Sequence, residues 1–190
     1  MILDYKKIIP KRYHEVSYED DVKSEIKNTF VEQIKARKGF YIYGEAGVGK
    51  TYLACALIKK ILEEGFKVRF FNTGDFLEQL REEFEKGFGD NYEYLGLFRE
   101  TMNFKGILVF DDIGAEKISD WARERLYLII NKRYEDMTPT IFTSNCDMEI
   151  LSARLGDRVT SRLFQMTEII KLNGSDKRLT MKNTNGTQTK

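Results

Sequence analysis

Short apolar runs alternate along the chain with longer stretches in which apolar residues recur at helical spacing. The short runs are rich in β-branched and aromatic residues, a composition that predicts strands at 38–43, 66–71, 106–110, 138–144 and 164–171. The run at 106–110 is apolar without interruption, which is typical of a strand that is buried on both faces.

The stretches between these runs are predicted to be helices. In 21–37, apolar residues recur every three or four positions and would share one face of a helix. A second predicted helix begins near Gly49, and a third begins at Thr73 as its N-cap. A fourth ends at about Asn103, and a fifth spans 119–134. Residues 147–164 are predicted to form two short helices separated near Gly156. Because strands that alternate with helices imply a parallel sheet covered on both faces, the predicted fold class is α/β, with a three-layer α-β-α arrangement around a five-stranded parallel sheet.

Three stretches interrupt this alternation. Residues 1–20 are polar and irregular, and Pro10 is expected to block a helix there. Gly87–Asn91 is expected to separate two helices. Residues 183–190 contain no apolar side chain and are expected to be disordered.

One strand-to-helix connection carries a phosphate-binding pattern. After the run at 38–43 the chain reads Gly-x-x-x-x-Gly-Lys-Thr and then enters a helical stretch, which is the order of a P-loop. Glycines let the loop wrap around phosphate with its N–H groups pointing inward, and the helix adds its positive dipole end. The residues expected to bind the phosphates and the nucleotide are Gly44, Glu45, Ala46, Gly47, Val48, Gly49, Lys50, Thr51 and Tyr52.

Composition, net charge and cysteine content limit the classes of protein to which this chain can belong. The 190 residues are 42% hydrophobic and 32% charged, values typical of a globular domain with a sizeable core. The formal net charge of +1 means that nucleic-acid binding would need a local basic patch. Cys55 and Cys146 fit no metal-site spacing and are expected to be buried thiols in a reducing compartment. No apolar run approaches the roughly 18 residues of a membrane span, so a cytoplasmic location is expected.

Two carboxylates follow the most apolar of the predicted strands. Asp111 and Asp112 stand at its carboxyl end, and in a parallel sheet this is the edge where the P-loop also lies. Asp111 is expected to hold Mg²⁺ together with the Thr51 hydroxyl, while Asp112 is placed to act as general base on an attacking water. The alternative is a polar turn after a strand.

Further polar residues complete the pattern. Asn145 ends the next predicted strand, where an amide could contact the attacking water or the γ-phosphate, although Asn is also a common turn residue. Arg158 and Arg162 are four residues apart and would share one face of a helix. Such a face is usually solvated, but an arginine finger acting on a neighbouring subunit is the functional alternative.

Taken in order, these motifs resemble those of AAA+ ATPases. They are Gly44–Thr51, Ile107–Ala115, Thr143–Asn145 and Gly156–Leu163. More narrowly the chain resembles the DnaC/IstB group, which contains bacterial and phage helicase loaders and transposition ATPases. Asp111–Glu116 followed by Ser119–Arg123 is the part most specific to that group. The resemblance covers about residues 8 to 180 and implies a P-loop NTPase core without a separate helical lid domain.

The resemblance also implies roles for single residues. Lys50 and Thr51 would bind phosphate and Mg²⁺, Asp111 and Asp112 would form the Walker B pair, and Asn145 would be sensor 1. Arg162 would be the arginine finger that acts in trans, and Arg158 is a second candidate.

Two flanking stretches match the group as well. Arg178 falls where sensor 2 would contact the γ-phosphate in cis, although Asp176 stands where the family has Ser. Residues from Ile9 to Tyr13 would line the adenine pocket, but Tyr13 could equally be a packing residue. The implied organisation is an N-terminal segment contacting the nucleotide site (1–20), an AAA+ ATPase domain (21–180) and a disordered tail (181–190).

The stretch from Thr73 to Lys105 falls where the group inserts helices that line a DNA channel. Its four basic residues are outnumbered by eight acidic ones, so a solvated charged face is the more favoured interpretation. The aromatic side chains that could stack on single-stranded bases, or serve as core, are Phe88, Tyr92, Tyr94 and Phe98.

The sequence therefore predicts an ATPase that uses ATP and Mg²⁺, forms homo-oligomers in the ATP state, assembles on single-stranded DNA and helps to load a replicative helicase. An IstB-like transposition ATPase that binds duplex DNA and recruits a transposase is the alternative. A small-molecule kinase or a GTPase on the same P-loop is a third possibility, although no Asn/Thr-Lys-x-Asp guanine-reading motif is present.

Overall fold

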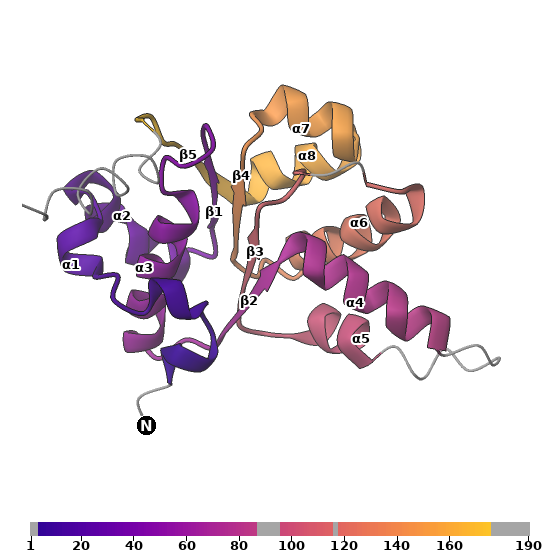
Figure 1. The fold of residues 1–190 in the computed structure, drawn as a ribbon, viewed down its shortest axis with the longest axis horizontal. Coiled ribbons are helices and arrows are strands. Elements are labelled where there is room, and N and C mark those ends of the chain that lie inside the picture. Colours follow the sequence, from indigo (N-terminus) through magenta and orange to yellow (C-terminus); the bar gives the residue numbers. More distant parts are fainter. Residues whose placement is uncertain (1–3, 87–95, 116–117, 176–190) are drawn as a thin grey trace, which may run out of the picture.

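Five parallel strands form the sheet of the computed structural model, which describes residues 4–86, 96–115 and 118–175 (Figure 1). In the order β2-β3-β4-β1-β5, each strand pairs in parallel with its neighbour. The strands are β1 (Gly39–Tyr43), β2 (Val68–Asn72), β3 (Ile107–Asp111), β4 (Thr140–Ser144) and β5 (Thr167–Lys171). The predicted fold class is confirmed, and all five carboxyl ends meet at one edge of the sheet.

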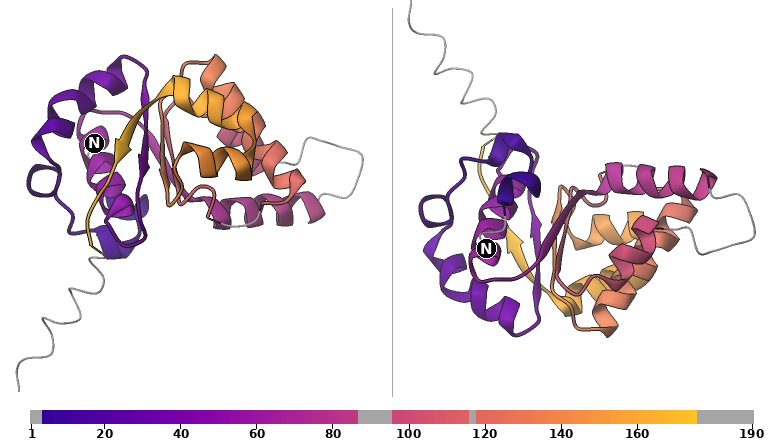
Figure 2. Two further views of the ribbon diagram at one scale, coloured as in Figure 1. Left: turned by 90° about the horizontal axis from the view of Figure 1, so that it is seen from above. Right: turned by 90° about the horizontal axis from the view of Figure 1, so that it is seen from below.

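Helices cover both faces of the sheet, which makes three layers (Figures 1 and 2). One face carries α1 (Tyr18–Asp21), α2 (Ser24–Lys35) and α3 (Lys50–Glu63). The other face carries α4 (Thr73–Lys86), α5 (Gly96–Asn103), α6 (Asp120–Glu135), α7 (Met148–Leu155) and α8 (Asp157–Met166). Up to residue 175, where the description of the C-terminal part ends, no helix follows β5.

Alternation along each strand divides the core into two clusters. Phe40 and Ile42 of β1 point into the cluster under α2 and α3, whereas Tyr41 points into the cluster under α4 to α8. Every residue of β3 is buried, because both faces of this strand are covered. The strands that carry the predicted site residues are therefore held rigidly from two sides.

The N-terminal prediction was wrong in part. Residues 1–20 are not simply irregular, since the described portion forms two 3-10 turns, Tyr5–Lys7 and Lys11–Tyr13, and then α1. Pro10 does not block the second turn but precedes it as N-cap with φ −58°, the angle that its ring imposes. Helix α2 begins only at Ser24, because Val22 has extended backbone angles after α1.

Two element boundaries also differ from the prediction. Thr73 is the first residue of α4 and not its cap, because Asn72 Oδ1 accepts from the N–H groups of Gly74 and Asp75. Residues 164–166 belong to α8 and not to the last strand, since Met166 continues the buried stripe of that helix. The predicted break at Gly87–Asn91, Phe88, Tyr92, Tyr94 and the tail from 181 lie outside the described residues.

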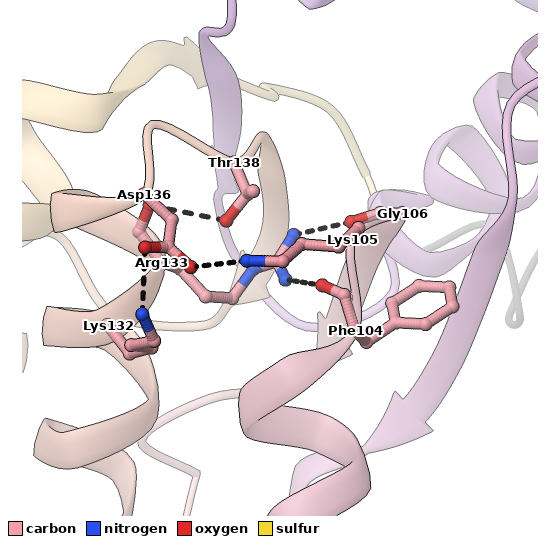
Figure 3. Close-up of polar contacts among 7 residues, drawn as sticks. All are labelled: Phe104, Lys105, Gly106, Lys132, Arg133, Asp136 and Thr138. Carbon is pink, nitrogen blue, oxygen red and sulfur yellow. Dashed lines mark hydrogen bonds and ion pairs between the residues drawn. The ribbon is translucent and has the colours of Figure 1, made fainter.

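A buried arginine joins elements at the amino-terminal edge of the sheet (Figure 3). Arg133 of α6 is 1% exposed, and its guanidinium donates to the carbonyls of Phe104, Gly106 and Pro139 and to the Thr140 hydroxyl at 2.6–2.9 Å. Burial lowers the pKa of Arg133, while these four acceptors hold its protons. One side chain thus links α6 to the starts of β3 and β4.

Candidate active site

The loop between β1 and α3 has the geometry of a phosphate cradle. Gly49, which caps α3, has φ +102°, a conformation that residues with a Cβ rarely adopt. A Cβ on Gly44 would stand 2.2 Å from the Leu172 carbonyl oxygen, so β5 passes too close for any side chain there. Glycine is therefore required at both positions for steric reasons, independently of any ligand.

Lys50 is folded back onto this loop. It is 7% exposed, and its Nζ donates to the carbonyl oxygens of Gly44 and Glu45 at 2.9 and 2.8 Å and to Asn145 Oδ1 at 2.6 Å. The ammonium group thus spans the P-loop and the end of β4. Each of these acceptors is neutral and could be exchanged for a phosphate oxygen.

Asp111 faces the first turn of α3. Thr51 Oγ1 lies 2.9 and 3.1 Å from its two carboxylate oxygens, and Thr143 Oγ1 donates to Oδ1 at 2.6 Å. Burial raises the pKa of the Asp111 carboxyl above its usual value, and the hydrogen bonds from Thr143 and Thr51 oppose that shift. A buried carboxylate beside a hydroxyl is an oxygen donor pair that suits a hard cation.

Asp112 has an unusual backbone. Its φ is +61°, in the left-handed region, and its N–H donates to Thr143 Oγ1 at 2.8 Å. Its Oδ1 accepts from Asn145 Nδ2 at 3.0 Å. Asn145 therefore bridges Lys50 and Asp112 with the two ends of one amide.

A cavity of about 500 Å³ brings these residues together with the N-terminal segment. Of the residues predicted from Ile9 to Tyr13, Arg12 and Tyr13 line it, whereas Ile9 is buried in the core. Among the described residues, the lining is Arg12, Tyr13, Asp21, Ala46, Gly47, Gly49, Lys50, Thr51, Tyr52, Asp112 and Asn145, so the predicted residues Gly44, Glu45, Val48 and Asp111 lie outside it.

The N-terminal wall of the cavity is fixed by two side chains of α3. Tyr52 donates its hydroxyl to Asp21 Oδ2 at 2.8 Å, and burial together with this bond raises the pKa of Tyr52 to about 12. Lys59 Nζ donates to the carbonyls of His14 and Val16 at 2.7 and 2.6 Å. The helix that begins at the P-loop thus also holds the segment on the other side of the cavity.

The predicted arginines lie elsewhere. Arg158 and Arg162 belong to α8, and their guanidinium carbons stand 5.2 and 5.0 Å from the centre of the Tyr127 ring on α6. Arg162 also donates to Asn131 and to the Arg158 carbonyl. Neither arginine lines the cavity of its own chain, and Arg178 lies outside the described residues.

A second hollow of about 720 Å³ adjoins the first at Asp112. It lies between α4 and the connection from β3 to α6, and among the described residues of its lining Arg81 is the one basic residue. Asp75, Glu78, Glu82 and Glu85 also line it, so its walls are acidic.

Phe98 is one of the aromatic side chains that could either stack on bases or serve as core. It packs against the core cluster under α4 to α8, beneath the guanidinium group of Arg125, which agrees with a packing role.

Sequence reasoning missed three residues of the site. Asp21 carried no motif and comes to the cavity only because α1 packs on α3. Thr143 stands out only as part of the Thr143–Asn145 motif, and β4 contains two other hydroxyl residues, so the sequence carries no further signal for it. The role of Lys59 in holding the N-terminal segment could not be foreseen from the helical pattern that contains it.

The fold and the site define a P-loop protein of the AAA+ class. Its marks are a P-loop after β1, paired carboxylates after β3 and an asparagine after β4, all at one edge of a parallel sheet. Within that class, the chain belongs to the family described as IstB-like ATP binding protein, whose model matches residues 18–185. The resemblance to the DnaC/IstB group is thereby confirmed.

Individual relatives point to two kinds of protein. The replicative helicase loader DnaI of Bacillus subtilis is 26% identical over 154 residues, covering 74% of this chain and 48% of that protein. The putative ATP-binding protein of insertion sequence IS5376 from Geobacillus stearothermophilus is 28% identical over 151 residues, covering 77% and 57%. The chain thus spans about half the length of these curated relatives.

A crystal structure of the DnaC helicase loader is similar to this chain over the whole of its own length. It has a TM-score of 0.73 and 31% identity, and the match covers 86% of this chain and 100% of that one. Within the described residues, no helix has the length and apolar character needed to cross a membrane.

Proposed function

We propose that this chain is an ATP-hydrolysing AAA+ switch that acts in DNA replication as a helicase loader and assembles on single-stranded DNA. The observation that carries the hydrolytic part is the convergence of Lys50, Thr51, Asp112 and Asn145 on one cavity, with Asp111 hydrogen-bonded to Thr51. These residues follow three strand ends and are joined by hydrogen bonds.

Nucleotide binding would exchange the present partners of Lys50. Phosphate oxygens are stronger acceptors for an ammonium group than the carbonyls and the amide that now surround it. The N–H groups of Gly44 to Thr51 and the start of α3 would surround the remaining phosphate charge. On the opposite wall, Arg12, Tyr13 and Tyr52 would contact the base and sugar.

The oxygen pair of Thr51 and Asp111 fits a Mg²⁺ ion, which commonly takes one or two protein oxygens together with substrate phosphates. When bound, the ion would neutralise charge on the β- and γ-phosphates. Asp111 would be held in place by its hydrogen bond from Thr143.

Hydrolysis would be carried by Asp112 and Asn145. Water attacks the γ-phosphorus, its proton passes to the Asp112 carboxylate, and the bond from the γ-phosphorus to the bridging oxygen breaks to leave ADP. Asn145 already contacts both Lys50 and Asp112, so it would register whether a γ-phosphate stands between them.

A second copy of the chain would complete the site. Arg162, with Arg158 as second candidate, lies on α8 away from its own cavity and would reach the γ-phosphate of a neighbour. ATP would thus favour a homo-oligomer, and hydrolysis would loosen it. Arg178 would act in cis as sensor 2, within an ATPase domain of 21–180 that follows a nucleotide-contacting segment at 1–20.

The similarity to DnaI and DnaC supports a replicative helicase as partner, and a loader acting on bacterial DNA would work in the cytoplasm. The insertion-sequence relatives support the alternative, an IstB-like ATPase that binds duplex DNA and recruits a transposase. The hollow beside α4 supports neither single-stranded nor duplex DNA as ligand, because its acidic walls would repel the phosphates of both.

One pair of measurements tests the proposal. The protein with ATP is titrated with single-stranded and duplex DNA of equal length, and is then used to capture the replicative helicase of its host. The proposal expects tighter single-strand binding and ATP-dependent capture. A preference for duplex together with capture of a transposase would establish the alternative.

A further inference from the structure

One buried hydroxyl contacts both aspartates of the site, the carboxylate of Asp111 and the backbone N–H of Asp112. Thr143 is 1% exposed and is the fourth residue of β4, where its main chain is in register with Ile42 of β1. The ladder between β3 and β4 ends with Phe110 opposite Phe142, one residue before Thr143 would face Asp111. Beyond this pair the regular pairing of β3 with β4 ends, and Thr143 contacts the residues that follow through its side chain and its carbonyl oxygen.

Thr143 makes three hydrogen bonds to consecutive residues after this point. Its Oγ1 donates to Asp111 Oδ1 at 2.6 Å and accepts from the Asp112 N–H at 2.8 Å. Its carbonyl oxygen accepts from the Ile113 N–H at 2.8 Å. The hydroxyl is therefore used in both directions, as donor to one aspartate and as acceptor from the next.

We propose that Thr143 is a positioning residue that aims Asp111 at the cation and holds Asp112 in its left-handed conformation. This inference rests on the proposed function, because it assigns a role toward the metal and the water of that same site. Left-handed backbone is unfavourable for a residue with a Cβ, so the Asp112 conformation needs external support. The bond to Thr143 Oγ1 supplies that support from a strand that is itself fixed by β1.

The role of Thr143 toward Asp111 follows from the same geometry. The Asp111 carboxylate accepts from Thr51 through both oxygens, and Thr143 adds a bond to Oδ1 alone. A cation held by the Thr51 hydroxyl and Asp111 would thus meet a carboxylate whose orientation is already fixed by Thr143. Hydrogen-bonded support of this kind for a ligating carboxylate typically changes metal affinity or activity by 10- to 100-fold.

Thr143→Val tests this with little change in shape, because it replaces the hydroxyl by a methyl group. Thr143→Ser keeps both hydrogen bonds and is the conservative variant. Thr101→Val is the matched control, since Thr101 is also fully buried but its Oγ1 has no hydrogen-bond partner within the described residues. Each variant is titrated with Mn²⁺ in the presence of ADP, with the bound ion followed by electron paramagnetic resonance, and with ADP alone in a chelator.

Thr143→Val is expected to bind Mn²⁺ in the ADP complex roughly 10- to 100-fold more weakly. ADP binding in chelator stays as in the wild type, and Thr143→Ser and Thr101→Val keep the wild-type ion affinity. Wild-type Mn²⁺ affinity in Thr143→Val would overturn the inference. An equal loss of ADP binding in chelator would also overturn it, because Thr143 would then only hold the fold together.

This outcome is separable from that of the proposed function. If the wild-type protein captured no helicase but Thr143→Val lost Mn²⁺ selectively, the loader proposal would fail and the positioning role would stand. If the wild-type protein bound no nucleotide at all, both would fail, and ADP titration of the wild type alone reveals that case.

Discussion

Two buried cations stand at opposite edges of the same sheet, and their surroundings differ in one decisive respect. Lys50 lies at the carboxyl edge and Arg133 at the amino edge, and they are 7% and 1% exposed. Both donate to neutral oxygens. Lys50, however, borders a cavity of about 500 Å³, whereas Arg133 lines neither of the two hollows described above.

This difference separates function from architecture. The acceptors of Lys50 belong to a loop and to an exposed amide, so a ligand with better acceptors can replace them. The acceptors of Arg133 are backbone carbonyls and a hydroxyl that join α6 to β3 and β4, and Figure 3 shows two of them, the carbonyls of Phe104 and Gly106. Burial of a charge alone therefore does not mark a site, whereas burial beside an open cavity with exchangeable partners does.

The largest expected effect is on the carboxyl edge. Lys50→Ala should abolish nucleotide binding, because no other lysine or arginine of the described chain reaches the P-loop carbonyls. Its thermal stability should not fall much, since the loop loses a cation that is costly to bury. Titration with a fluorescent ATP analogue and a melting curve measure both. Retained binding at the wild-type affinity would refute the assignment of Lys50.

The next effect concerns chemistry at the same edge. Asp112→Asn should keep nucleotide binding and slow phosphate release by roughly 10²- to 10⁴-fold, the usual contribution of a general base. Steady-state ATPase assays beside the binding titration separate the two. Hydrolysis by this variant at the wild-type rate would show that Asp112 is not the base.

The amino edge should respond in the opposite sense. Arg133→Met leaves three carbonyls and the Thr140 hydroxyl without their donor, which should lower the free energy of unfolding by about 1–3 kcal/mol for each acceptor that water cannot reach. Denaturant unfolding measures this loss, and the folded fraction should still bind ATP. A variant with wild-type stability but weakened ATP binding would reverse the roles given to the two cations.

The smallest effect is a pH dependence at the carboxyl edge. Burial raises the pKa of Asp111 in the folded protein, so folding favours its protonated form. The cost of burying the charge is therefore absent below the unfolded pKa of about 3.9 and complete above the higher folded pKa. In chelator, Asp111→Asn should be slightly more stable than the wild type at neutral pH, and acid should remove that gain. A gain that persists unchanged into acid would point to packing instead.

The carboxyl edge was also the more predictable of the two regions. The P-loop, Asp111, Asp112 and Asn145 follow from strand ends in a parallel sheet, and that rule needs no knowledge of packing. The structure brings Lys50, Thr51, Asp112 and Asn145 to one cavity and joins Asp111 to Thr51 by a hydrogen bond.

What could not be predicted depends on contacts between distant positions. The bonds of Arg133 to Phe104 and Gly106, and of Thr143 to Asp111, join residues about 30 positions apart and depend on strand register. The start of α4 was misplaced for a local reason, since either Asn72 or Thr73 could cap it and the Thr73 hydroxyl instead donates to the Asp111 carbonyl. Sequence patterns indicate whether residues such as Arg133 and Thr143 are buried or polar, but they do not indicate which distant residue each one contacts.

A single spectrum compares the two cations directly. With ¹⁵N-labelled lysine and arginine, the Nζ signal of Lys50 and the Nε signal of Arg133 are assigned by substitution and followed as ATP is added with Mg²⁺. The account predicts that the Lys50 signal shifts in step with binding while the Arg133 signal stays in place. Movement of Arg133 with an unmoved Lys50 would contradict it.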